Sequence, residues 1–137
     1  MAYNNILLIS DFCSGSRVLL DLAISVAIPY HSRISVIIEI YEPELFLLCE
    51  THVFEEYKEI LFAEARLFYN HMTKDIEYPT SAIYTYSNKF FESIIKIQPD
   101  FDLIIFSRCS YNLGKKSDIF INGESMKFGS DVLIAYT

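Results

Sequence analysis

Glycine is scarce in this sequence, with four residues among 137. Loops that wrap phosphate groups usually need several glycines, because bare backbone must approach the oxygens closely and adopt positive φ angles. None of the patterns G-x-G-x-x-G, G-x-x-x-x-G-K-[ST] and G-x-S-x-G occurs. The sequence therefore lacks the residues on which dinucleotide-binding, Walker and α/β-hydrolase sites depend.

Cysteine and histidine are few and widely spaced. The three cysteines are an odd number without a C-x-x-C pair, which argues against a disulfide framework and a cysteine-based zinc site. They are Cys13, Cys49 and Cys109, and we expect reduced thiols. The three histidines are too dispersed for a chelating pair, and they are His31, His52 and His71. No histidine accompanies Cys109 in its turn, so the sequence predicts no metal site and no catalytic residue.

Positive charge is also in deficit, with 11 Lys and Arg against 18 Asp and Glu and a net charge of −7. Such a surface repels phosphate backbones and anionic lipid, so we expect no nucleic-acid or membrane partner. No apolar run approaches the ~18 residues of a membrane span, and residues 1–10 lack the basic start of a signal peptide. The sequence predicts a cytoplasmic protein with a single domain over residues 1–137.

What the sequence does contain is a set of short apolar runs separated by helical patterns. Runs without polar alternation are typical of strands covered on both faces of a parallel sheet. We expect such strands at residues 4–10, 33–41, 102–106 and 132–136, and a more polar edge strand at residues 80–86.

Helices are predicted between these runs. The turn at residues 11–16 offers capping side chains before a helix that Pro29 ends. The longest periodic stretch, residues 50–74, predicts a surface helix with one apolar stripe. That stripe comprises Val53, Phe54, Tyr57, Ile60, Leu61, Leu67, Phe68 and Met72. A short helix is expected before Pro99, and a weaker one over residues 117–127, where a glycine interrupts the pattern.

This alternation predicts a doubly wound α/β fold, in which a five-stranded parallel sheet carries helices on both faces. The strand order is expected to be 3-2-1-4-5, with the flavodoxin-like order as its relative. In either order the ligand crevice lies beyond the carboxyl ends of the first and fourth strands. Residues 11–16 and 107–114 should therefore line it.

Two interpretations of the crevice side chains remain open. Asp11 and Ser16 stand at a helix amino terminus, where free N–H groups and the helix dipole favour an anion such as phosphate. The alternative is that these side chains only cap the helix and bind backbone groups, which is the commoner role. Arg108 can pair with an anion or with Asp11, although a solvent-facing arginine is the more frequent case.

The last predicted strand is apolar and lies at the edge of the sheet in the 3-2-1-4-5 order. An apolar open edge favours pairing with another strand. Antiparallel pairing with the same strand of a second copy would build a symmetric homodimer. We expect the interface to comprise Val132, Leu133, Ile134, Ala135 and Tyr136.

Four segments together resemble the universal stress protein family. They are NNILLISDFCSGSRVLLDLAISVA, SVIIEIY, PDFDLIIFSRCSYN and DVLIAY, so the resemblance covers nearly the whole chain. Its matching positions are Asp11, Ser16, the small helix residues Ala23 and Ala27, and Asp102 before the fourth strand. The resemblance implies the adenine nucleotide alpha hydrolase-like form of the doubly wound fold.

The nucleotide-binding branch of that family carries G-x-x-G, nine residues and then G-[ST] after the fourth strand. In this chain Ser110 and Leu113 stand at the first two glycine positions, and Gly123 and Glu124 stand at the last pair. Side chains at these positions would occupy space that phosphate oxygens need, and Glu124 would repel them. The chain is more similar to the non-nucleotide-binding universal stress protein A type. The family implies that this type is a cytoplasmic homodimer made under starvation and other stresses.

We therefore expect a non-catalytic stress-response protein that acts through dimerisation and protein contacts, without a cofactor. The alternative is a nucleotide-dependent switch that binds ATP or AMP weakly in a remnant crevice. That crevice would comprise Asp11, Ser16, Ile40, Ser107, Arg108 and Ser110. A third class, adenylyl transfer, would need an H-x-G-H-like pair of histidines, and residues 11–16 contain none.

Overall fold

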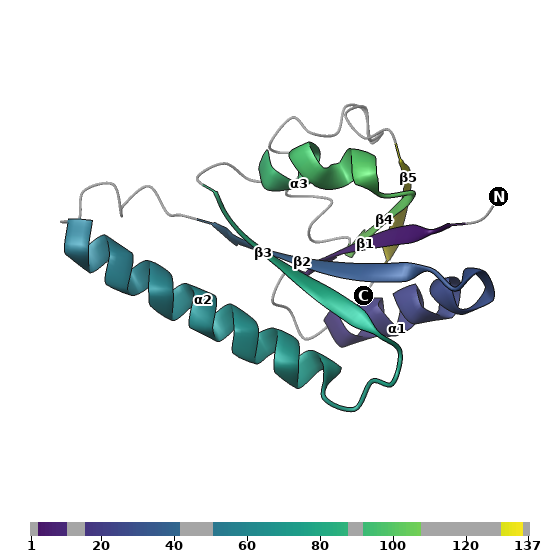
Figure 1. Cartoon of the computed structure of the whole chain (residues 1–137), viewed down its shortest axis with the longest axis horizontal. Helices are drawn as coiled ribbons and strands as arrows, with labels where there is room; N and C mark the ends of the chain where they lie inside the picture. Colours follow the sequence, from purple (N-terminus) through teal and green to yellow (C-terminus); the bar gives the residue numbers. More distant parts are fainter. Residues whose placement is uncertain (1–2, 11–15, 42–50, 88–91, 108–129, 136–137) are drawn as a thin grey trace.

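The computed structural model describes residues 3–10, 16–41, 51–87, 92–107 and 130–135. Five parallel strands form one sheet in the order β3-β2-β1-β4-β5, which confirms the predicted fold and strand order (Figure 1). The strands are β1 (Asn5–Ser10), β2 (Arg33–Tyr41), β3 (Thr80–Ser87), β4 (Leu103–Ser107) and β5 (Asp131–Ala135). Each begins and ends within one residue of its expected position.

Helices cover both faces of the sheet, as predicted. They are α1 (Ser16–Ala27), α2 (Thr51–Thr73) and α3 (Glu92–Ile97), with 3-10 turns η1 (Ile28–Tyr30) and η3 (Gln98–Asp100). Side chains of α1 and α2 pack on one face, and Ile94 of α3 packs on the other. The expected helix over residues 117–127, Tyr136, and the side chains of Val53 and Phe54 lie outside the described residues.

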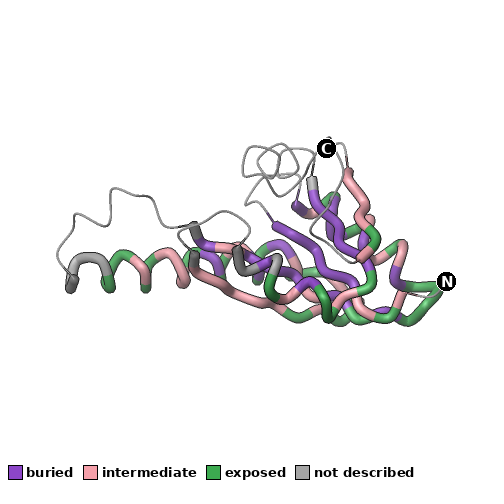
Figure 2. Tube along the Cα trace, turned by 90° about the horizontal axis from the view of Figure 1, so that it is seen from above, coloured by how far each residue is buried: buried purple, intermediate pink, exposed green. Residues whose placement is uncertain are grey.

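The central strand β1 explains why its sequence is a continuous apolar run. Ile6 and Leu8 point into the layer beneath α1 and α2, whereas Leu7 and Ile9 point into the layer beneath α3. All four side chains are at most 3% exposed. Figure 2 shows the buried residues concentrated in the strands at the centre of the molecule. Neither face of this strand can accept a polar residue without a desolvation cost, so the alternation typical of half-exposed strands is absent.

The apolar stripe of α2 is only partly the one that the sequence predicted, because Leu61, Phe68 and Met72 are confirmed and three other positions are exposed. The side chains that pack on the sheet and α1 are Leu61, Phe62, Ala65, Phe68, Tyr69 and Met72. Tyr57, Ile60 and Leu67 were expected on that stripe, but they are 42%, 54% and 68% exposed. The buried face is centred on the small Ala65 and on Tyr69, whose hydroxyl bonds to β3. The prediction relied on large apolar side chains and therefore left out Ala65 and Tyr69. The structure nevertheless buries this small residue and this tyrosine against the sheet.

Candidate functional site

The described part of the predicted crevice lies at the carboxyl ends of β1, β2 and β4. Ser16, Ile40 and Ser107 belong to described elements there, although the side chain of Ser107 is outside the described residues. The other candidates also lie outside the described residues, and they are Asp11, Arg108, Ser110 and the three cysteines. The structure therefore brings Ser16 and Ile40 to the expected end of the sheet and leaves the remaining assignments as predictions.

A pair of buried hydroxyl groups closes the connection from β1 to α1. The Oγ atoms of Ser10 and Ser16 lie 3.3 Å apart, and the two residues are 6% and 2% exposed. Ser16 is the first residue of α1, so the pair fixes the start of the helix against the end of the strand. Sequence reasoning missed Ser10, although a serine at each end of the turn is a usable signal. This pair supports the structural interpretation of Ser16, because a hydroxyl this buried is not open to a ligand from solvent.

Ile40 contributes packing at the end of β2. It is 4% exposed and belongs to the apolar layer between the sheet and the two helices α1 and α2. Its side chain is therefore part of the core. Any role for this residue in a crevice would have to come from its backbone.

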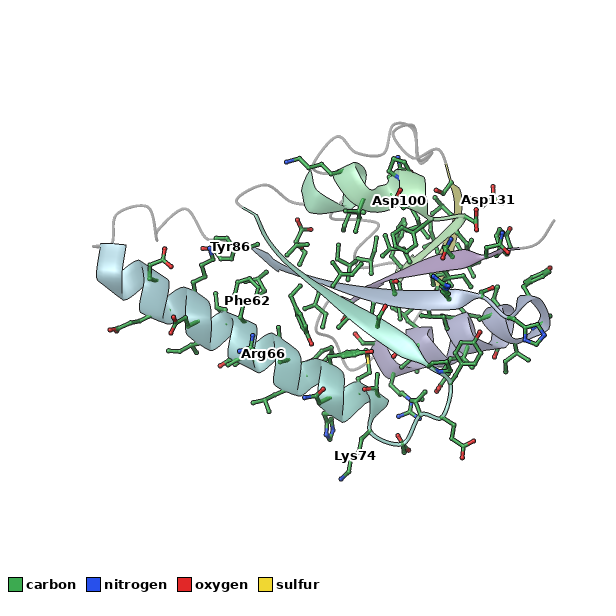
Figure 3. The ribbon with its side chains drawn as sticks, in the orientation of Figure 1. Phe62, Arg66, Lys74, Tyr86, Asp100 and Asp131 are labelled. Atoms are coloured by element: carbon green, nitrogen blue, oxygen red, sulfur yellow. The ribbon has the colours of Figure 1, made fainter. Side chains whose placement is uncertain are left out.

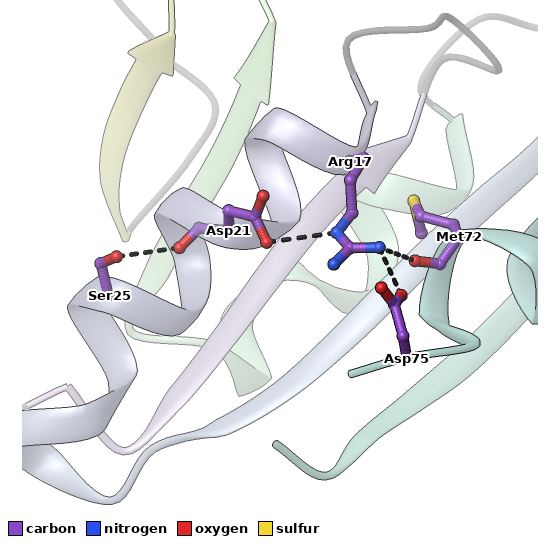
Figure 4. Close-up of polar contacts among 5 residues, drawn as sticks. All are labelled: Arg17, Asp21, Ser25, Met72 and Asp75. Atoms are coloured by element: carbon purple, nitrogen blue, oxygen red, sulfur yellow. Dashed lines mark hydrogen bonds and ion pairs between the residues drawn. The ribbon is translucent and has the colours of Figure 1, made fainter. Parts of the chain in front are cut away.

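Arg17 joins α1 to the carboxyl end of α2 (Figure 4). Its Nε donates to Asp21 at 3.2 Å, and its Nη1 donates to Asp75 at 2.8 Å and to the Met72 carbonyl at 3.2 Å. Carbonyls in the last turn of a helix lack intrahelical donors, so Arg17 caps α2. The hydrogen bond from Arg17 lowers the pKa of Asp75, and the bonds to Asp75 and Asp21 raise the pKa of Arg17. The guanidinium is thus committed to joining two helices rather than to an anion.

Asp102, one of the positions that carries the family resemblance, also has a structural role. Its Oδ2 accepts hydrogen bonds from the backbone N–H groups of Asn4 at 2.8 Å and Asn5 at 2.9 Å. Its backbone N–H donates to the Asn5 carbonyl, and its carbonyl accepts from the N–H of Asp131. One residue therefore connects the amino ends of β1, β4 and β5, far from the predicted crevice.

Two cavities adjoin at the amino ends of β2 and β3, the opposite end of the sheet from the predicted crevice. The first, of about 580 Å³, is lined by His31, Ser32, Arg33, Ile34, Tyr78, Pro79, Thr80 and Ser81. Ser32 donates its hydroxyl to the Tyr3 carbonyl, and Tyr78 donates its hydroxyl to the Ser32 carbonyl. The second, of about 590 Å³, includes the carboxylates that Arg17 binds. The polar groups that line the first cavity therefore hold its turns together. The two carboxylates that line the second cavity bind Arg17.

β5 forms the outer edge of the sheet beside β4. Its register pairs Leu103 with Asp131 and continues to Ser107 with Ala135. From Val132 to Ala135 all four residues are half-buried, with alternate side chains packed into the two apolar layers. No described residue pairs with the outer edge of this strand. The structure confirms the predicted position of the strand at the edge of the sheet.

Metal and membrane signals were sought within the same described ranges. No three His, Cys, Asp or Glu side chains there converge in a way that could hold a metal ion. His31 and His71 are exposed on separate elements. None of the described helices combines the length and the apolar character needed to cross a membrane.

Known proteins resemble this chain both in sequence and in fold. No protein-family model matches the chain. Universal stress protein C of Escherichia coli strain K12 is 27% identical over 107 residues, which are 77% of this chain and 75% of that protein.

Solved structures extend the similarity to nearly the whole chain. The hypothetical protein MJ0577 has a TM-score of 0.75 at 20% identity, covering 100% of this chain and 98% of its own. Universal stress protein UspA from Lactobacillus plantarum has a TM-score of 0.71 at 14% identity, covering 98% of each chain. A universal stress protein in complex with cAMP has a TM-score of 0.61 at 13% identity, covering 99% of this chain and 98% of its own.

The structural likenesses show that the fold is shared. The sequence relative shows in addition a similarity to universal stress protein C. The 3-2-1-4-5 parallel sheet, the apolar central strand and the small buried residues of α1 are all present in this chain. With these features and the relatives together, this chain is similar in sequence to universal stress protein C and shares the fold of universal stress proteins.

Proposed function

We propose that this protein is a non-catalytic, cytoplasmic homodimer of the stress response that pairs through β5 and works without a bound nucleotide. The observation that carries the proposal is the half-buried apolar strand β5, whose outer edge pairs with no strand in the described part of the chain. Unpaired N–H and C=O groups beside apolar side chains favour the addition of a strand. A second copy offers the same edge, and an antiparallel arrangement satisfies both sets of groups around one two-fold axis.

The opposite edge of the sheet provides an internal comparison. Within the described part of the chain, β3 is also paired on one side only. Most residues of its sequence, TSAIYTYS, carry hydroxyl groups. Ser81 is exposed and its hydroxyl bonds to Ser35 of β2, so polar groups occupy part of that surface. Polar edges discourage strand addition. The difference between the two edges favours β5 as the site of pairing.

The dimer is tested by comparing two matched substitutions in sedimentation measurements at micromolar concentration. Ile134 of β5 and Ile83 of β3 are both half-buried and pack in the layer beneath α3. Ile134→Lys should convert the dimer to a monomer, whereas Ile83→Lys should lose comparable packing and remain a dimer. Amide hydrogen exchange of β5 should also be slower than that of β3 at high concentration. A monomeric wild type, or equal effects of the two substitutions, would refute pairing through β5.

The absence of a nucleotide requirement is supported by the residues that replace glycine. Ser110 and Leu113 stand where the family's nucleotide-binding pattern has glycines, and a Cβ at such a position blocks close approach of phosphate to the backbone. Glu124 stands where the pattern has serine or threonine. Calorimetric titration with ATP and AMP, on protein first treated to release any bound small molecule, should give no measurable heat of binding. Tight binding of either nucleotide would overturn this part of the proposal.

The second candidate function is a nucleotide-dependent switch. It is favoured by one observation, the similarity in fold to a universal stress protein in complex with cAMP. Under this alternative, cAMP, ATP or AMP would bind at the carboxyl ends of β1 and β4. An Asp11→Ala variant would then lose the binding heat while it kept the stability of the wild type.

A further inference from the structure

Three large apolar side chains are exposed along α2, and two of them, Ile60 and Leu67, lie on the side of the helix opposite the buried Ala65 and Tyr69. Tyr57, Ile60 and Leu67 are 42%, 54% and 68% exposed and account for half of the exposed large hydrophobic residues recorded for the described chain. Spacings of three and seven residues place them on one stripe of a helix. In Figures 1 and 2 the first turns of this helix also project beyond the sheet. We call this stripe, together with the half-exposed Ala63 between Ile60 and Leu67, the outer face of α2.

The charges beside the outer face are unevenly distributed along the helix. Glu55, Glu56 and Glu59 are exposed in its first half, whereas Arg66 and Lys74 are exposed at its second half and just past its end. Lys58, the basic residue of the first half, lies over the Tyr86 ring at 4.5 Å and so faces β3. Figure 3 shows Lys74 pointing away from the sheet. The first half is therefore acidic, whereas the second half and the residues just past it carry Arg66 and Lys74 together with the exposed acidic residues Glu64 and Asp75.

We propose that the outer face of α2 binds the same face of a second copy of this chain, with the two helices antiparallel. This interface is separate from β5 and does not depend on the dimer proposed above. In an antiparallel pair the acidic first half of each helix meets the half of the other that carries Arg66 and Lys74, whereas a parallel pair would place the two acidic halves together. A lipid surface is a poorer occupant, because the acidic half would be repelled by anionic headgroups.

A simple register satisfies the apolar residues and the charges together. When Ile60 of one copy lies against Leu67 of the other, Ala63 falls near the two-fold axis, where a small side chain permits close approach of the helices. In the same register Glu59 lies near Arg66 of the second copy, on the same flank of the pair. Glu64, which is exposed, is the unfavourable residue, because the two copies of it approach each other near the axis.

The first test compares association of three single variants by analytical ultracentrifugation over a range of concentrations. Leu67→Glu should weaken association about 100-fold or more, since two buried leucines are lost per pair. Glu64→Ala should strengthen it, because the repulsion at the axis is removed. Ile28→Glu is the matched control, since Ile28 is 56% exposed but lies on η1. It should leave association unchanged, and circular dichroism should show that all three variants fold.

The second test uses charge exchange to identify the antiparallel partner. Glu59→Lys and Arg66→Glu alone should each weaken association about fivefold, and the double variant should restore it. The two residues are seven positions apart on one helix and do not face each other within a chain. All measurements are repeated in the Ile134→Lys background, so that pairing through β5 cannot contribute.

The outcomes separate this inference from the proposed dimer. In the Ile134→Lys background, association that is lost in Leu67→Glu and recovered in the charge-exchanged double variant supports the α2 interface, whatever β5 does. If Leu67→Glu and Glu64→Ala both behave like Ile28→Glu, the outer face does not bind a second copy. If the single charge variants weaken association and the double variant does not restore it, the antiparallel arrangement is wrong.

Discussion

Removing the Asp102 carboxylate should destabilise the protein without changing its assembly. Both hydrogen bonds to the N–H groups of Asn4 and Asn5 end on the same oxygen, Oδ2, at 2.8 and 2.9 Å. Hydrogen bonds to a charged acceptor contribute about 1.5–3 kcal/mol each in general, and the lower end applies here because the site is exposed. We therefore expect Asp102→Ala to lower the free energy of unfolding by about 2–3 kcal/mol.

Asp102→Asn should have an intermediate effect. An amide oxygen can occupy the position of Oδ2 and accept both bonds, so only the charge is lost and the expected cost is about 1 kcal/mol. In urea titrations these costs correspond to midpoint shifts of about 1–1.5 M for Asp102→Ala and about 0.5 M for Asp102→Asn, for an m-value near 2 kcal/mol/M.

Asp100→Ala is the matched control for this series. Asp100 is exposed in η3, two residues before Asp102, and substitutions at such positions usually change stability by less than about 0.5 kcal/mol. If Asp102→Ala were no less stable than Asp100→Ala, the structural role would be refuted. The family's aspartate at this position would then need a functional explanation.

Two titratable groups give pH-dependent predictions. Arg17 lowers the pKa of Asp75, so the ionised carboxylate stabilises the fold above its unfolded pKa, and this contribution is lost as the pH falls through the folded pKa. Asp75→Asn should therefore be less stable than the wild type at neutral pH and converge with it near pH 2 in urea titrations; a constant difference would contradict the link to Arg17. Burial raises the pKa of Tyr84, so its contribution is present below the unfolded pKa and lost as the pH rises through the folded value. Tyr84→Phe should reduce the alkaline loss of stability and remove a late step from the ultraviolet titration of the tyrosines, and an unchanged titration would contradict this.

The fold could be predicted because the strands that are buried on both faces leave little choice of residue. β1, β2 and β4 read as continuous apolar runs, and right-handed crossovers then restrict the order of the strands. The predicted stripe of α2 was right at Leu61, Phe68 and Met72 and wrong at Tyr57, Ile60 and Leu67, because hydropathy does not distinguish an apolar residue that packs on a sheet from one that is exposed. Ala65 lies closest to the sheet, and its small size gave no signal in the sequence.

The candidate site was harder to predict than the fold. Ser16 was expected either to hold an anion or to act locally, and its buried contact with Ser10 favours the local role. Arg17 was not singled out, because its three acceptors come from two segments that are distant in the sequence. A pattern of neighbouring residues cannot reveal a contact of this kind. Asp102 was recognised only as part of a resemblance, and its contacts supply the physical reason for an aspartate there.

The central position of β1 has a consequence for folding during synthesis. Its neighbour β2 follows early in the chain, but its other neighbour, β4, comes much later. Asp102, just before β4, is 98 residues from Asn4 and 97 residues from Asn5, the two residues that it binds. On the ribosome, the first half of the sheet can assemble while the edge of β1 that pairs with β4 is still unpaired. During that interval β1, an apolar strand that is buried on both faces in the folded protein, is a target for mispairing with other nascent chains. A chaperone that shields this strand until residue 107 has emerged would raise the yield of folded protein, and slow translation between β2 and β4 would lower it.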